Sequence, residues 1–167
     1  MIAYLDIETS FSGEVTVVGV LRPDRGTVQL VAPAVSADHI SEVLSGVDTI
    51  CTYNGEQFDL PVLGRATGLD MLRDYRSEDL VLQCRRANLR GGLKAIESTL
   101  GIPRVWHGLS GYDAMLLWDR WTNGSREALE TLLGYNRDDV LNLALLERRL
   151  KGDLGTVLPD HLSVVGV

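Results

Sequence analysis

The chain has 167 residues, of which 45% are hydrophobic and 23% are charged, as is typical of a globular protein with one sizeable core. Its longest apolar runs, such as residues 15–21, are far too short to span a bilayer, and its first residues lack the pattern of a signal peptide. We therefore expect a single domain without a membrane span. Cys51 and Cys84 lie in apolar surroundings without metal-type spacing, which predicts reduced, buried thiols and a cytoplasmic location.

The net charge of −7 counts against a nucleic-acid-binding protein, which is usually basic. The charge is unevenly distributed along the chain, however. Residues 1–59 contain nine acids and only two cations, whereas residues 73–104 contain seven cations and four acids. An acidic region followed by a basic one suits metal ions beside a phosphate track, and it is equally compatible with an ordinary solvated surface.

The first half of the chain alternates short β-branched runs with turn signals. In chain order, the patterns predict strands at residues 3–9, 14–21 and 27–31, a helix through residues 40–44, a strand at 48–53 and a helix from 58 to between 64 and 68. Ser36 or Asp38 is expected to cap the first of these helices. A turn at residues 22–26 joins the second and third strands.

The second half is mostly helical. The patterns predict a short strand within residues 78–84 and helices at 93–100, 113–121, 125–133 and 135–150. The resulting order of elements predicts an α/β fold with one mixed β-sheet flanked by α-helices. We expect one domain over residues 1–167, with a core of about residues 1–151 and a C-terminal tail, 152–167, that the patterns do not place.

Two carboxylates interrupt the first predicted strand. Asp6 and Glu8 are two residues apart, so in a strand they project from the same face. No Lys or Arg precedes Arg22, and buried carboxylates require a positive partner. A bound divalent cation would satisfy both. The alternative is that the strand ends at Leu5 and both acids lie in a solvated turn.

Two other acids follow apolar segments. Asp59 begins a predicted helix directly after a buried strand, where α/β proteins place functional groups, although it could equally complement the helix dipole. Tyr135 and Asp139 are four residues apart and therefore share one face of the last helix. A solvated helical turn is the alternative for this pair.

These residues together form a familiar pattern. Asp6-x-Glu8, Asn54-x-x-x-Phe58-Asp59 and Tyr135-x-x-x-Asp139 resemble the three motifs of the DEDD 3′–5′ exonuclease superfamily, tyrosine branch, which has a ribonuclease H-like fold. Residues 91–97 (GGLKAIE) and 135–140 (YNRDDV) are most similar to its YprB-like group. The resemblance covers about residues 4–150. Each of the shorter motifs arises often by chance, but all three occur here in the expected order.

The resemblance implies a role for each matching residue. Asp6, Glu8, Asp59 and Asp139 would bind two Mg²⁺ or Mn²⁺ ions, and the hydroxyl of Tyr135 would position the attacking water. Thr9, Asn54, Phe58 and Lys94 would contact the substrate, although Phe58 could belong to the core and Lys94 could simply be solvated. Asp138 competes with Asp139 for the ligand role; the spacing from Tyr135 favours Asp139, with Asp138 turned outward.

The implied function is a metal-dependent 3′–5′ exonuclease that hydrolyses phosphodiester bonds of single-stranded DNA or RNA. Two alternatives keep the same fold: a non-catalytic nucleic-acid-binding or scaffolding domain, and an endonuclease. The residues do not identify protein partners or a preference between DNA and RNA, because that preference depends on contacts to the sugar 2′ position.

Overall fold

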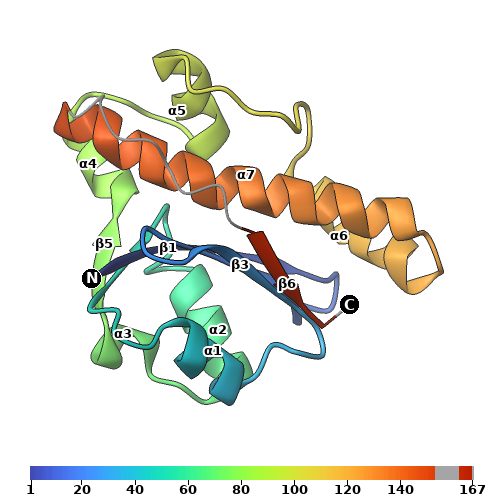
Figure 1. Cartoon of the computed structure of the whole chain (residues 1–167). Coiled ribbons are helices and arrows are strands. Elements are labelled where there is room, and N and C mark those ends of the chain that lie inside the picture. The colour runs from blue at the N-terminus through green and yellow to red at the C-terminus, as the bar shows by residue number, and fades with distance from the viewer. Residues whose placement is uncertain (153–161, 167) are drawn as a thin grey trace.

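A computed structural model of the chain describes residues 1–152 and 162–166 (Figure 1). The strands are β1 (Ile2–Thr9), β2 (Val15–Arg22), β3 (Gly26–Val31), β4 (Thr49–Thr52), β5 (Arg76–Asp79) and β6 (Leu162–Val165). The helices are α1 (Ala37–Val43), α2 (Asp59–Thr67), α3 (Met71–Asp74), α4 (Leu80–Arg86), α5 (Leu93–Leu100), α6 (Gly111–Thr122) and α7 (Arg126–Lys151).

The strands form one mixed sheet in the order β5-β4-β1-β2-β3-β6. β1, β2 and β3 form an antiparallel meander, whereas β4, β5 and β6 are parallel to their neighbours. β1 therefore lies in the interior of the sheet between β2 and β4. The predicted α/β fold with a mixed sheet flanked by helices is confirmed.

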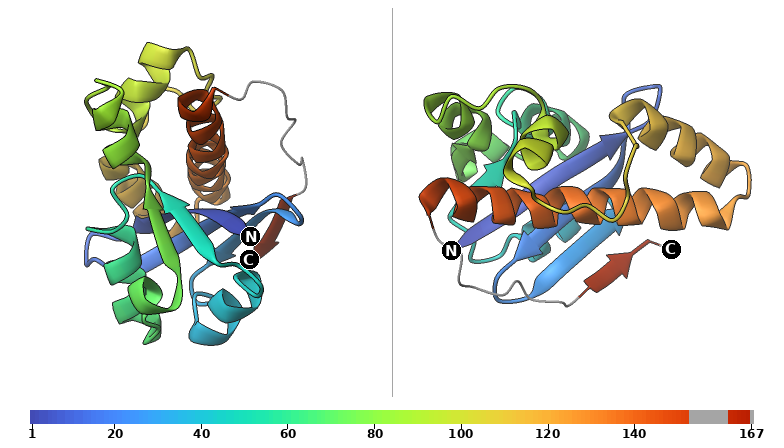
Figure 2. Two further views of the ribbon diagram at one scale, coloured as in Figure 1. Left: turned by 90° about the vertical axis from the view of Figure 1, so that its left-hand side faces the viewer. Right: turned by 90° about the horizontal axis from the view of Figure 1, so that it is seen from above.

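Helices cover both faces of the sheet (Figures 1 and 2). α1, α2 and α3 lie on one face, and α4, α5, α6 and the long α7 lie on the other. The side chains of β1 alternate between the two cores: Ala3, Leu5 and Ile7 pack towards α1 and α2, and Tyr4 packs towards α7. Asp6 and Glu8 share the face of Tyr4, because side chains two apart in a strand point the same way.

One predicted strand is largely a helix. Residues 78–84 were expected to contain a strand, but β5 ends at Asp79 and α4 begins at Leu80. The Asp79 side chain caps α4 by accepting a hydrogen bond from the backbone N–H of Val81, at 3.1 Å. Leu80 and Cys84 are both fully buried, and their four-residue spacing places them on one helical face.

Two predicted helices, at residues 125–133 and 135–150, are one continuous helix, α7. The prediction separated them at Gly134, but this glycine lies inside the helix. A Cβ atom at Gly134 would lie 2.0 Å from Nε1 of Trp106, so the indole requires a residue without a side chain there. Gly134 therefore reflects a tertiary contact, not a helix end.

Part of the unplaced tail is a strand, since β6 pairs with β3; residues 153–161 and 167 lie outside the described residues. Cys51 and Cys84 are both buried and form no disulfide. No helix in the described parts of the chain combines the length and apolar character needed to cross a membrane.

Candidate active site

A cavity of about 350 Å³ opens where β1 ends, between the starts of α2, α5 and α6 and the middle of α7. Its lining includes all nine residues that the sequence singled out: Asp6, Glu8, Thr9, Asn54, Phe58, Asp59, Lys94, Tyr135 and Asp139. These residues come from four separate segments of the chain, residues 6–9, 54–59, 94 and 135–139. The structure thus brings the predicted site residues to one place, and their individual roles remain predictions.

Three of the four predicted metal ligands are in close proximity. Asp6, Glu8 and Asp139 each offer a carboxylate oxygen, and these oxygens all lie within 4.8 Å of one another. Asp59 lines the same cavity but is not part of this group. Its Oδ1 accepts a hydrogen bond from the backbone N–H of Ile7, at 3.1 Å, which ties the start of α2 to β1.

Burial makes these acids reluctant to ionise. Loss of solvation is the main cause that raises the pKa of Asp6 and of Glu8, and the nearby charge of Asp139 raises both further. Burial likewise raises the pKa of Asp59, to about 7, although its hydrogen bond from Ile7 opposes the shift. Ionising these acids together therefore requires a positive counterpart in the cavity.

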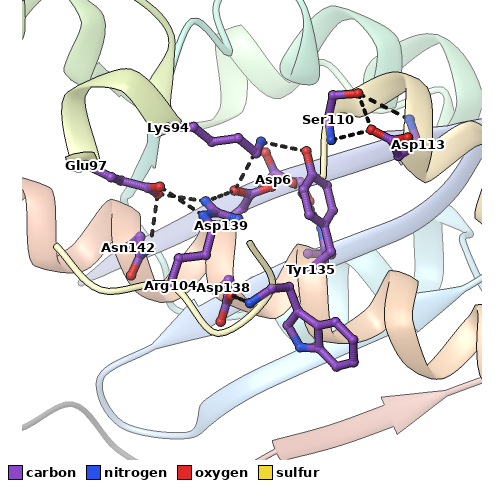
Figure 3. Close-up of polar contacts among 12 residues, drawn as sticks. Asp6, Lys94, Glu97, Arg104, Ser110, Asp113, Tyr135, Asp138, Asp139 and Asn142 are labelled. Atoms are coloured by element: carbon purple, nitrogen blue, oxygen red, sulfur yellow. Dashed lines mark hydrogen bonds and ion pairs between the residues drawn. The ribbon is translucent and has the colours of Figure 1, made fainter. Parts of the chain in front are cut away.

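Lys94 provides part of that positive charge. Its Nζ donates a hydrogen bond to the Tyr135 hydroxyl, at 2.6 Å, and lies 3.8 Å from Oδ1 of Asp139 (Figure 3). Tyr135 is 2% exposed, and burial raises the pKa of its phenol above the usual value. Its hydroxyl therefore remains protonated at neutral pH and can donate a hydrogen bond while accepting one from Lys94.

Adjacent acids on α7 have different environments. Asp139 points into the acidic cluster, as the spacing from Tyr135 predicted (Figure 3). The expectation that Asp138 turns outward was wrong, because Asp138 is only 9% exposed. Its Oδ2 accepts hydrogen bonds from the backbone N–H groups of Val105 and Trp106, at 2.9 and 2.8 Å. Asp138 therefore fastens the segment between α5 and α6 to α7.

Sequence reasoning missed the ion pairs around Arg104. This guanidinium donates to both oxygens of Glu97, at 2.9 and 2.7 Å, and also to Oδ1 of Asp139 (Figure 3). Asn142 donates to Glu97 at 3.1 Å and completes the group. The absence of cations before Arg22 suggested that no protein cation was near, but the fold supplies Arg104 from far along the chain. The only sequence signal was its place in the basic stretch of residues 73–104.

A second missed group orients Asp6. The Asn136 amide donates to Oδ2 of Asp6, at 3.0 Å, and its own oxygen accepts from Gln29 at 2.8 Å. Asn136 and Gln29 are fully buried. The sequence signal for this contact is Gly19 in the buried strand β2: a Cβ there would lie 2.2 Å from Oδ1 of Asn136. Only glycine allows the amide to approach the strand.

The predicted substrate contacts lie around the acids. Phe58 is 47% exposed, so the alternative that it belongs to the core is wrong. Asn54 adopts a left-handed backbone conformation with φ of 63°. Its N–H donates to Asp79 Oδ1 at 2.7 Å, so the cap of α4 also holds the loop before α2. Thr9 ends β1 at the cavity.

Comparison with known proteins identifies the family of this chain. A family model described as the RNase H superfamily matches residues 3–151. The chain belongs to the RNase H superfamily. No curated protein matches this RNase H superfamily member.

Solved structures are similar in fold. One is the family B DNA polymerase from the hyperthermophilic archaeon Pyrobaculum calidifontis, with a TM-score of 0.65 and 18% sequence identity. The match covers 89% of this chain but 24% of the polymerase. The chain therefore corresponds to about a quarter of that protein's length, and the likeness concerns the fold alone.

Proposed function

We propose that this RNase H superfamily protein is a metal-dependent 3′–5′ exonuclease, of the tyrosine branch of the DEDD group, acting on single-stranded DNA or RNA. The observation that carries the proposal is the convergence of Asp6, Glu8 and Asp139 within 4.8 Å of one another. Asp59 and Tyr135 line the same cavity, which supports their inclusion in the site.

The donor set fits a hard divalent cation. All the candidate ligand atoms are carboxylate oxygens, which Mg²⁺ and Mn²⁺ prefer, and the site contains no Cys or His among its lining residues. Burial also leaves these acids in need of positive charge. Asp6, Glu8, Asp59 and Asp139 would hold two ions, which when bound activate water and stabilise charge on the phosphate oxygens.

The remaining residues of the site would orient the metal ligands and contact the substrate. Asn136 holds Asp6 by its Oδ2, and the Ile7 N–H holds Asp59, so both carboxylates are positioned before any ligand arrives. The Tyr135 hydroxyl accepts from Lys94 and can direct its own proton towards a water or phosphate oxygen. Exposed Phe58 offers a ring beside the cavity for a terminal base.

The polarity of cutting can be tested with labelled oligonucleotides. The pure protein is incubated with single-stranded DNA and RNA in Mg²⁺ or Mn²⁺, each strand carrying its label at one end. A 3′–5′ exonuclease converts a 5′-labelled strand into a ladder of progressively shorter products, and from a 3′-labelled strand it releases labelled mononucleotide first. Chelation should abolish both patterns. Release of labelled mononucleotide from the 5′ end would contradict the proposed direction.

Matched variants connect activity to the site. Asp6→Asn and Asp139→Asn should abolish cleavage while the circular dichroism spectrum stays native, because both changes keep side-chain size. Asp138→Asn is the neighbouring control: it removes a charge from α7 where Asp138 accepts from the N–H groups of Val105 and Trp106, outside the acidic cluster. Full activity in either purified cluster variant would refute the assignment.

Two alternatives have distinct outcomes. The ion pair of Arg104 with Asp139 favours a non-catalytic nucleic-acid-binding domain, since it already neutralises one candidate ligand. Binding without shortening of any substrate, in either metal, would support that alternative. Cleavage of circular single strands would indicate an endonuclease.

A further inference from the structure

A second, smaller cavity adjoins the candidate active site. It has a volume of about 230 Å³ and lies over α4 and the segment between α4 and α5. We refer to it as the arginine groove; it is lined by Tyr53, Val81, Arg85, Leu89, Arg90 and Gly91. The proposed function assigns no role to this groove, although it lies within the basic stretch noted in the sequence.

The groove carries positive charge that no described protein group neutralises. Arg85 and Arg90 line it, Arg86 is adjacent to Arg85 at the end of α4, and all three are exposed. None of the three guanidinium groups forms an ion pair or a side-chain hydrogen bond within residues 1–152 and 162–166. By contrast, Arg22, Arg73 and Arg104 each pair with an acid. In a chain with a net charge of −7, this local excess is a distinct feature.

The groove borders the acidic cavity at Tyr53. Tyr53 lines both, and its hydroxyl donates to the carbonyl of Gly91 at 2.6 Å, which fixes the ring between them. Beyond Gly91 the chain passes through Gly92, where a Cβ would meet nothing within 4 Å, to Leu93 and Lys94 of the acidic cavity. No bulky side chain at Gly91 or Gly92 separates the two cavities.

The chemistry of the groove suits a phosphodiester backbone. Free guanidinium groups bind phosphate oxygens through paired N–H donors, and the Tyr53 ring can stack on a base or sugar. A strand whose 3′ end occupies the acidic cavity must leave it by some path, and the protein's overall negative charge disfavours most of the surface. The arginine groove begins at the cavity wall and offers the opposite charge.

We propose that the arginine groove binds the substrate strand upstream of its 3′ end, with Arg85, Arg86 and Arg90 contacting its phosphates. This inference rests on the proposed function for the identity of the strand. It predicts that affinity depends on substrate length, because a trinucleotide fills only the acidic cavity whereas a longer strand also reaches the groove.

The test compares two charge-matched double variants. Arg85→Glu with Arg90→Glu alters the groove; Arg65→Glu with Arg126→Glu makes the same charge change on exposed arginines of α2 and α7 outside both cavities. Binding of fluorescent single strands of three and twelve thymidines is measured by anisotropy in chelator, where the proposed reaction cannot proceed. Circular dichroism and thermal melts check that every variant is folded.

The groove variant should bind the twelve-nucleotide strand at least tenfold more weakly than wild type, with less than half that loss on the trinucleotide. The slope of log K against log salt should become shallower by about 1.4, because two phosphate contacts of a single strand are lost. The control variant should bind both strands within about twofold of wild type. Equal losses in the two variants, or an unchanged affinity for the long strand, would overturn the proposal.

Its failure can be distinguished from failure of the proposed function. If wild type cleaves and the groove variant binds long strands normally, the groove inference alone is wrong. If wild type does not cleave but the groove variant selectively loses affinity for the long strand, the groove is a nucleic-acid-binding surface and the exonuclease proposal is wrong. Binding of a poly-glutamate peptide is measured in the same way. If the groove variant no longer binds this peptide but still binds the oligonucleotides as wild type does, the groove fits an acidic protein partner and the inference is overturned.

Discussion

Arg104 should act as a built-in counter-ion for the acidic cavity in the metal-free protein. Its side chain is 7% exposed, and its two partners, Glu97 and Asp139, are 3% and 5% exposed. Arg104→Gln would leave buried Glu97 without its cation and Asp139 with Lys94 alone. Removing one member of such a buried pair typically costs about 3–5 kcal/mol. We expect a loss of that size in the free energy of unfolding in the presence of chelator.

Divalent metal should restore part of this loss. With Arg104 gone, Asp139 would be free of its guanidinium and the cavity would carry more negative charge, so metal affinity should rise, by about tenfold or about 1.4 kcal/mol. At a metal concentration of about 100 times Kd, binding adds about 2.7 kcal/mol to the stability of the folded state. The assay is urea unfolding followed by circular dichroism, in chelator and in excess Mn²⁺, with Mn²⁺ affinity measured by calorimetry.

A second buried arginine provides the control. Arg22 is 1% exposed, pairs with Asp24 and donates to the backbone carbonyls of Val43 and Ser45, outside the acidic cavity. Relative to wild type measured under the same condition, Arg22→Gln should lose the same unfolding free energy in chelator and in Mn²⁺. If Arg104→Gln gains no more from Mn²⁺ than Arg22→Gln does, the counter-ion argument is wrong.

Glu97→Gln should have the opposite effect on metal binding. In the folded protein Arg104 shares its charge between Glu97 and Asp139. Without the Glu97 charge, the guanidinium would act on Asp139 alone, so Mn²⁺ should bind more weakly than to wild type. Calorimetric titration of both variants measures these opposite signs directly, and a shift in the same direction for both would contradict the electrostatic explanation.

Two further predictions concern packing and pH. Gly134→Ala should destabilise the protein by about 1–3 kcal/mol, because its Cβ would collide with the Trp106 indole, whereas Gly111→Ala, with nothing within 4 Å, should be neutral or stabilising in the same urea assay. Folding raises the pKa of Asp59 from its usual value of about 4 to about 7, so the folded state holds this proton more tightly than the unfolded state. In chelator, the free energy of unfolding should therefore fall as pH rises from about 4 to about 7. Asp59→Asn should make that decline shallower in thermal melts, and an unchanged decline would show that Asp59 does not titrate in this range.

The local elements were largely predictable from sequence because their signals are local. The two-residue spacing of Asp6 and Glu8 placed both on one face of β1, and the four-residue spacing from Tyr135 selected Asp139 over Asp138. The predicted boundaries failed at Asp79 and Gly134. Asp79 caps α4 and also accepts a hydrogen bond from Asn54, and Gly134 is required by the Trp106 indole. Both boundaries therefore depend on residues far away in the chain.

By itself, the sequence determined the class of fold, because strand and helix periodicity depend on neighbouring positions. The resemblance of its motifs to those of a known family indicated the residues that meet at the cavity. Only the tertiary structure decided what surrounds them: the Arg104 and Lys94 charges at Asp139, the Asn136 amide on Asp6, and the groove beside Tyr53. These contacts join residues that are 35 to 130 positions apart in the chain. Pairings over such separations depend on how the helices pack on the sheet, which no local pattern of residues encodes.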